Sequence, residues 1–267
     1  MIDHGKRNVL GVKIDAVDYE AAVQRIIAAA HDERPYAVSA LAVHGVMTGV
    51  LQRSHRHRLN RFDLVAPDGQ PVRWALNLLH RTKLTQRVYG PTLMLRVCER
   101  AAQEQLPIFL FGGTPELLAM LSARLGEQFP KLIIAGAMPS RFRQVSQEEA
   151  EETAATIRAS GAKITFVGLG CPRQEVWTYE MRQSLAMPLL AVGAAFNFHA
   201  GLLPQAPTWL QDHGLEWAFR FFHEPLRLWR RYALLNPLYL TLLALQLTGL
   251  HRFDEAADAT PTRVGYG

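Results

Sequence analysis

The chain has 267 residues, of which 49% are hydrophobic and 20% charged, a balance that is ordinary for a folded globular protein and disfavours disorder before the tail that follows Arg252. The net charge of +5 indicates an anionic partner, such as a sugar nucleotide, a phospholipid headgroup or a nucleic acid. Cys98 and Cys171 are the two cysteines, so no disulfide framework is predicted. Since no signal peptide is recognised, we expect a reducing cytosolic setting.

Predicted helices and strands alternate along the first 200 residues. In chain order we expect a helix at 19–30, a strand at 36–41, helices at 70–80 and 91–105, a strand at 107–113, a helix at 114–129, a strand at 131–137, a helix at 146–160, a strand at 163–170, a helix at 172–183 and a strand at 188–196. Thr114 and Ser146 are expected N-caps, and Glu149 completes a capping box with Ser146. Continuously apolar strands between helices predict a Rossmann-like α/β fold, with a parallel sheet covered by helices on both faces.

After about residue 200 the predicted strands stop and the chain becomes helical and basic. We therefore expect three parts: a core over 1–200, a helical membrane-associating appendage over 201–253 and a flexible tail over 254–267.

Within the appendage, segment 232–250 carries no charge, but Asn236 and Pro237 interrupt it as the cap and first turn of a new helix. The remainder is too short for a hydrocarbon core of roughly 30 Å. This pattern predicts attachment at the membrane interface, and a helix buried on the core is the alternative.

Two predicted strands end in glycine-rich turns. Gly112 and Gly113 lie in FLFGGTPE, and Gly168 and Gly170 lie in FVGLGCPRQE. Ligands of parallel α/β sheets bind beyond the carboxyl ends of the strands, where glycine allows the backbone to approach a phosphate. Tight turns without a ligand are the alternative, because neither turn is a Walker P-loop or a G-x-G-x-x-G fingerprint.

Asp68 and Arg87 are candidate catalytic residues. Asp68 follows a short apolar run in LVAPDGQPVRW, at an expected strand-to-helix corner, and an unperturbed aspartate has a pKa of about 3.9. An ionised carboxylate there can accept a proton from a hydroxyl, although a turn or cap is the commoner role of Asp-Gly. Arg87 is either a surface charge or a partner for a carboxylate or a diphosphate.

The appendage is rich in arginine. Arg227, Arg230 and Arg231 share one face of a helix that begins at Pro225, and Arg220 precedes it. A solvated amphipathic helix is one interpretation. Contact with anionic lipid at a bilayer surface is the other, because tryptophan and leucine accompany the arginines.

The sequence gives no sign of a catalytic metal. No Asp-x-Asp pair occurs, and the histidines lack metal-ligand spacing. His55 and His57 lie in QRSHRHRLNR, which is typical of an exposed basic turn. We therefore expect no metal ligands and no cofactor.

Five ordered motifs give the chain a family resemblance. LVAPDGQPVRW, FLFGGTPE, FVGLGCPRQEVW, GAAFNFHAG and LEWAFRFFHEPLRLWRRY, within about residues 9–235, resemble the WecG/TagA/CpsF glycosyltransferases, glycosyltransferase family 26. The resemblance implies an inverting, metal-independent enzyme with a Rossmann-like core and a C-terminal appendage that helps to close the active site. Such enzymes transfer a sugar from a UDP-sugar to an undecaprenyl-diphosphate-linked sugar at the cytoplasmic face of the bacterial inner membrane.

The resemblance also implies roles for individual residues. Asp68 matches the proposed catalytic base, and Arg87 matches an active-site arginine. Gln174 and Glu175 match a Pro-x-Gln-Glu motif, with Gln174 near the sugar nucleotide. Arg220, Arg227 and Arg230 match appendage arginines that handle the lipid diphosphate, and we expect Arg231 to join them.

Departures from the family pattern bear on which sugar the nucleotide donor carries. Ser39 stands where many members have the Thr of a Thr-x-Asn motif, Leu41 replaces its Asn, and Phe196-Asn197 replaces Phe-Asp. SALAVHGVMTG and RVYGPTLML resemble the subgroup that assembles xanthan-type exopolysaccharides. That subgroup adds β-1,4-linked glucose from UDP-glucose to undecaprenyl-diphosphate-glucose, so we expect Ser39 and Asn197 to bind substrate in such a reaction.

Three alternatives remain open. Within the family, the alternative is a UDP-ManNAc or ManNAcA transferase for polymers of the teichoic-acid or enterobacterial-common-antigen type. A nicotinamide-dependent oxidoreductase would need the G-x-G-x-x-G turn that the sequence lacks. A basic protein that binds nucleic acid or membrane without catalysis would leave the Asp-Gly and Gln-Glu motifs without a purpose. We therefore expect a peripheral or monotopic enzyme on the anionic inner-membrane surface, with no nucleic-acid partner.

Overall fold

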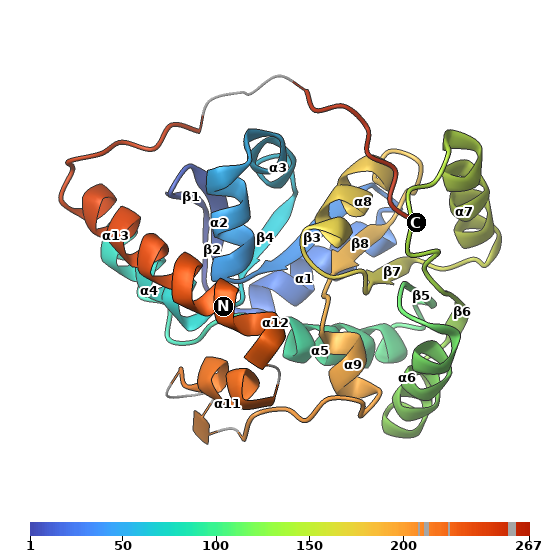
Figure 1. Cartoon of the computed structure of the whole chain (residues 1–267). Helices are drawn as coiled ribbons and strands as arrows, with labels where there is room; N and C mark the ends of the chain where they lie inside the picture. The colour runs from blue at the N-terminus through green and yellow to red at the C-terminus, as the bar shows by residue number, and fades with distance from the viewer. Residues whose placement is uncertain (208, 211–213, 224, 256–259) are drawn as a thin grey trace.

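The computed structural model describes residues 1–267 except 208, 211–213, 224 and 256–259, and except the side chains of 220, 225, 227, 230 and 231 (Figure 1). Its centre is a six-stranded parallel sheet with the order β4-β3-β8-β7-β5-β6. The strands are β3 (Tyr36–Leu41), β4 (Leu64–Pro67), β5 (Ile108–Phe111), β6 (Ile134–Met138), β7 (Ile164–Val167) and β8 (Pro188–Ala191). The predicted α/β fold is confirmed.

Helices cover both faces of the sheet because alternate strand residues point in opposite directions. In β5, Ile108 and Leu110 join one apolar cluster, while Phe109 and Phe111 join another on the opposite face. The first face carries α1 (Tyr19–His31), α5 (Gly90–Gln103), α6 (Pro115–Gln128) and α9 (Ala195–His199). The second carries α2 (Val43–Leu51), α4 (Gln70–His80), α7 (Gln147–Ala159), α8 (Arg173–Met181) and α13 (Asn236–Leu247).

Local sequence signals set several helix starts as predicted. Thr114 caps α6 by accepting a hydrogen bond from the Leu117 N–H at 3.3 Å. Ser146 and Glu149 form the expected capping box at the start of α7, with each side chain accepting from the other's backbone N–H.

Segment 53–59 overturns one expectation. It forms the helix α3 (Arg53–Leu59), in which His55, His57 and Arg58 are buried, so the predicted exposed basic turn is wrong. Burial, with Arg58 and His44 nearby, lowers the pKa of His55 to about 4, and its imidazole is therefore neutral at pH 7. Helix α8 packs against α3 and buries part of this charge-rich segment. The local sequence alone indicates a solvent-exposed segment.

Two further differences concern local turns. The strand expected at 188–196 ends at Ala191, because the chain turns at Gly193, with φ of 54°, and continues into α9. An N-terminal hairpin was also not predicted: β1 (Asp3–Val9) and β2 (Val12–Val17) pair antiparallel through a turn at Leu10 and Gly11, both with positive φ.

The C-terminal helices return to the sheet. Helices α11 (Glu216–His223) and α12 (Pro225–Arg230) lead through a π-helical turn, η1 (Arg231–Leu235), into α13. In α13, Tyr239 and Leu243 are buried in the apolar cluster of α2 and α4, and the Tyr239 hydroxyl donates to Pro71 O at 3.1 Å. Among the described residues, no helix has the length and apolar character needed to cross a bilayer. Because Tyr239 and Leu243 are buried, the core covers one side of α13.

The end of the chain, residues 260–267, lies beside α8 and the loop that precedes α7 (Figure 1). Glu180 accepts hydrogen bonds from the N–H groups of Val264 at 2.8 Å and Gly265 at 3.0 Å. The Val145 N–H in turn donates to Gly265 O at 2.7 Å. The end of the segment expected to be a flexible tail thus holds the loop between β6 and α7.

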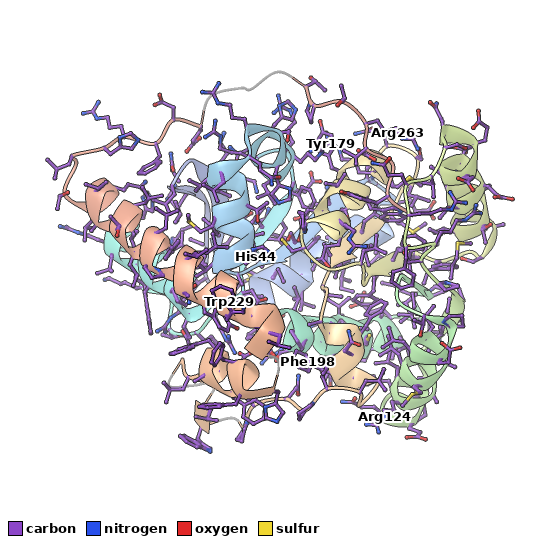
Figure 2. All side chains as sticks on the ribbon, in the orientation of Figure 1. His44, Arg124, Tyr179, Phe198, Trp229 and Arg263 are labelled. Carbon is purple, nitrogen blue, oxygen red and sulfur yellow. The ribbon has the colours of Figure 1, made fainter. Side chains whose placement is uncertain are left out.

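Removal of these acceptors should release the end of the chain. We expect Glu180→Ala to weaken local docking by about 1–3 kcal/mol and to speed tryptic cleavage after the exposed Arg263, labelled in Figure 2, by roughly 5- to 100-fold. Mass spectrometry of timed digests measures this rate. Glu151→Ala, which removes an exposed carboxylate on α7, is the control, and equal rates for the two variants would contradict the role of Glu180.

Candidate active site

Asp68 lies at the strand-to-helix corner predicted from the sequence. Leu41 and Pro67 are partners at the ends of β3 and β4, and the Asp68 N–H donates to Leu41 O at 3.2 Å. The Asp68 carboxylate also accepts a hydrogen bond from the Gly90 N–H at 3.4 Å. Its side chain is therefore fixed at the carboxyl edge of the parallel sheet, where ligands of such folds bind.

Two cavities meet at Asp68. The larger has a volume of about 570 Å³ and extends along the ends of β3, β8, β7 and β5, whereas the smaller has about 140 Å³ and lies beneath α11, η1 and the start of α13. Ala42, His44, Asp68 and Tyr89 line both cavities. A group at Asp68 can therefore face a ligand in each.

The glycine-rich turns form one end of the larger cavity. Gly113, Gly168 and Gly170 line it, whereas Gly112 does not. A Cβ on Gly112 would lie 2.9 Å from the carbonyl carbon of Gly168, and a Cβ on Gly168 would lie 2.4 Å from the Phe196 ring. The absence of side chains lets these two strand ends approach each other closely.

Gln174 and Glu175 form a buried hydrogen-bond network behind that turn. Glu175 Oε1 accepts from the Ser39 hydroxyl at 3.1 Å and from the Gln174 amide at 2.9 Å. Gln174 Oε1 accepts from the Gly170 N–H at 3.1 Å. Glu175 is fully buried, and burial raises the pKa of its carboxyl group. The network joins β3 to the turn before α8, and of its members Gly170, Gln174 and Glu175 line the larger cavity.

Arg87 pairs with a carboxylate of the C-terminal helices. Its guanidinium donates to Glu216 Oε2 at 2.5 Å and stacks on the Tyr89 ring at 4.3 Å, while the Tyr89 hydroxyl donates to Glu216 Oε1 at 2.9 Å. Burial opposes the charge of Arg87, but Glu216 and Asp68 outweigh it and raise the pKa of Arg87. A carboxylate or a diphosphate was the expected partner of Arg87, and in the structure Arg87 pairs with the carboxylate of Glu216.

Several residues of this arrangement were not predicted from the sequence. His44, labelled in Figure 2, comes from α2, and Arg173 from the start of α8 lines the larger cavity. Tyr89 and Glu216 lie inside motifs that the sequence displays, RVYGPTLML and LEWAFRFF, but only the fold pairs them. The one hint of a role for Glu216 in the sequence is that it is a carboxylate within an aromatic-rich motif.

The other predicted site residues differ in how far the structure describes them. Asn197 lies in α9 and lines the larger cavity, whereas Ser39 contributes to the network behind it. The side chains of Arg220, Arg227, Arg230 and Arg231 lie outside the described residues, so their role at a lipid diphosphate stays a prediction.

A sequence comparison assigns the family. The model of the Glycosyl transferase WecG/TagA/CpsF family matches residues 7–252, a span that includes every strand of the parallel sheet and the helices that roof the smaller cavity. The chain belongs to this glycosyltransferase family. Its activity is sugar transfer, and membership implies in general terms a nucleotide-sugar donor and a lipid-linked acceptor. Two cavities that share one carboxylate suit a glycosyltransferase, which must bring two ligands together.

The ion pair of Arg87 and Glu216 should control how the C-terminal helices close the site. Glu216→Gln keeps an acceptor for Tyr89 but removes the charge that faces Arg87. We expect docking of α11 to weaken by about 1.5–3 kcal/mol, so that amide exchange over 216–223 accelerates roughly ten- to hundred-fold. Hydrogen-exchange mass spectrometry measures this change.

The matched control is Glu20→Gln, which neutralises an exposed carboxylate paired with Arg100. Exposed pairs contribute about 0–1 kcal/mol, so exchange over 216–223 should stay unchanged. An unchanged rate in Glu216→Gln as well would show that this ion pair does not hold α11.

Proposed function

We propose that this protein transfers a hexose, glucose in the first instance, from a UDP-sugar to a sugar linked to undecaprenyl diphosphate, with inversion at the anomeric carbon. The observation that carries the proposal is the position of Asp68, which lines both the larger and the smaller cavity. The donor occupies the larger cavity, and the acceptor sugar enters through the smaller one. The product extends the repeat unit of a bacterial exopolysaccharide.

Asp68 acts as the general base. Its carboxylate takes the proton of the acceptor hydroxyl, whose oxygen attacks the anomeric carbon of the donor from the side opposite to the leaving UDP. Such a base typically contributes about 10²- to 10⁴-fold to the rate. The Gly90 N–H donates to Asp68 and orients its carboxylate, and Arg87 lies close enough for the two charges to interact.

The charge that develops on UDP lies at the end of the larger cavity that the glycine-rich turns form. Arg173 is the one lysine or arginine among the described residues that line it, and it stands at the start of α8 beside Gly168 and Gly170. A guanidinium group and backbone N–H groups at the start of a helix can stabilise the charge of a leaving diphosphate. In this proposal the protein's own groups carry that charge in the transfer step.

The residues of β3 that line the larger cavity favour glucose as the donor sugar. Leu41 stands where the family pattern has an amide, and it lines the larger cavity with its side chain buried. A buried leucine offers no hydrogen bond to an N-acetyl group, which supports a simple hexose over N-acetylmannosamine. UDP-ManNAc or ManNAcA is the second candidate because Asn197, in the same cavity, offers an amide.

The C-terminal helices support a place on the anionic cytoplasmic face of the inner membrane. They expose large apolar side chains: Trp217, Phe222, Leu226, Trp229, Leu234 and Leu240. Water-exposed tryptophan and leucine close to arginine suit an interfacial helix. Because these helices also roof the smaller cavity, a membrane bound here would lie next to the entrance for a lipid-linked acceptor.

Asp68→Asn should leave the fold and donor binding intact but lower kcat with UDP-glucose and a lipid-linked glucose acceptor by about 10²- to 10⁴-fold. UDP release in a coupled assay measures the rate. The parent protein is assayed with UDP-ManNAc in parallel, and it should use UDP-glucose at least tenfold faster.

Asp32→Asn, which neutralises an exposed carboxylate after α1, is the control for Asp68→Asn. Near-normal turnover of Asp68→Asn would show that Asp68 is not the general base. A preference for UDP-ManNAc would change the proposed donor sugar but not the role of Asp68.

The apolar side chains should anchor the protein to vesicles. We expect the double variant Phe222→Ser and Leu226→Ser to bind vesicles of phosphatidylglycerol at least tenfold more weakly, because each buried apolar side chain contributes about 1.5–3 kcal/mol. Sedimentation with the vesicles measures binding, and higher salt should weaken it further. Leu51→Ser, in an exposed leucine of α2, is the control, and equal binding by all three proteins would refute attachment through these helices.

A further inference from the structure

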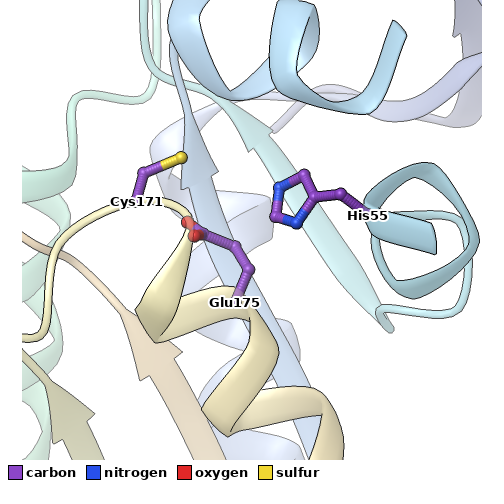
Figure 3. A group of neighbouring side chains, drawn as sticks. All are labelled: His55, Cys171 and Glu175. Atoms are coloured by element: carbon purple, nitrogen blue, oxygen red, sulfur yellow. The ribbon is translucent and has the colours of Figure 1, made fainter. Parts of the chain in front are cut away.

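Three side chains from two distant segments of the sequence converge beside the larger cavity. His55 comes from α3, Cys171 from the turn that precedes α8, and Glu175 from α8 itself (Figure 3). One ring nitrogen, the sulfur and one carboxylate oxygen all lie within 4.8 Å of one another. Contact between α3 and α8 sets this arrangement.

Two of these side chains are buried with polar atoms that lack a hydrogen-bond partner among the described residues. His55 is 1% exposed, and neither of its ring nitrogens has a partner. Glu175 is 0% exposed, and its Oε2 has none, whereas its Oε1 is bound by Ser39 and Gln174. Buried polar atoms are nearly always satisfied in folded proteins. The unpaired atoms of His55 and Glu175 belong to side chains that lie together with Cys171, and this grouping points to a shared partner.

The chemistry of the three groups indicates what that partner is. An imidazole nitrogen, a thiolate and a carboxylate together suit Zn²⁺, which binds nitrogen, sulfur and oxygen ligands at about 2.0–2.3 Å. Magnesium and calcium prefer oxygen ligands alone, so the sulfur and the imidazole argue against them.

The charges of the cluster agree with a divalent cation. A thiolate at Cys171 and a carboxylate at Glu175 together balance the two positive charges of Zn²⁺. The other groups that act on His55 are His44 and Arg58, and Arg58 faces the carboxylate of Glu180 at 4.0 Å. The net charge around the ion is therefore close to neutral.

We propose that His55, Cys171 and Glu175 bind one Zn²⁺ ion. Three protein ligands leave a fourth position, which water fills from the larger cavity, because Cys171 and Glu175 both line that cavity. The ion would join α3 to the turn of residues 168–172, which borders the donor. It holds this turn in place and takes no part in sugar transfer.

Metal binding by the full-length protein tests the proposal without any assay of transfer. Protein dialysed against a chelator is titrated with Zn²⁺ in a calorimeter and with Co²⁺ in a spectrophotometer. We expect one ion per chain, with the visible bands of four-coordinate cobalt and a near-ultraviolet thiolate-to-cobalt band. This titration needs no variant, so a folding defect cannot obscure it.

Variants then assign the ligands. Cys171→Ser should lose the thiolate-to-cobalt band and bind Zn²⁺ at least tenfold more weakly, and His55→Gln should also bind more weakly. Cys98→Ala is the matched control, because Cys98 is fully buried in the apolar cluster of α5 and should leave both signals unchanged. Failure of the parent protein to bind Zn²⁺ stoichiometrically, which would leave water as the shared partner, overturns the proposal. Persistence of the charge-transfer band in Cys171→Ser also overturns it.

Discussion

The position of α11 over the site depends on the buried carboxylate of Glu216. Arg87 and the Tyr89 hydroxyl both donate to it, at 2.5 and 2.9 Å, from the segment that precedes α5. A carboxylate withdrawn from water is tolerated only when it is paired, so the start of α11 has one favourable position. Gly90, the first residue of α5 and next to Tyr89 in the chain, donates its N–H to Asp68. One set of contacts therefore fixes the roof of the site relative to its candidate base.

The parallel sheet supplies the second constraint. Because all six strands run in one direction, their carboxyl ends and the turns that follow lie along one edge. Asp68, after β4, and the turn at Gly168, after β7, therefore line one continuous cavity, although a hundred residues separate them in the chain. The C-terminal helices then enclose the smaller cavity on the other side of Asp68. Two ligands can thus approach one carboxylate from different sides, as sugar transfer requires.

The sequence predicted those features that local chemistry decides. The capping box of Ser146 and Glu149 set the start of α7, and apolar runs between helices predicted the parallel sheet and the corner that holds Asp68. Features that arise between distant segments escaped prediction. His55 lies in a run of basic residues that is typical of a solvated turn, yet α8 buries it. Glu216 pairs with residues far along the chain, and no spacing in the sequence reveals such a partner. The proposed metal ligands have the same origin, since they come from two segments that meet only in the fold.

The central claim is that the donor occupies the larger cavity with its anomeric carbon turned toward Asp68. A crystal structure of the protein with UDP-glucose bound tests this claim most directly. We expect the diphosphate to lie between the turn at Gly168 and Arg173, with the sugar extending toward Asp68 and the smaller cavity still open to an acceptor. A nucleotide bound at another edge of the sheet, or a sugar that points away from Asp68, would contradict it.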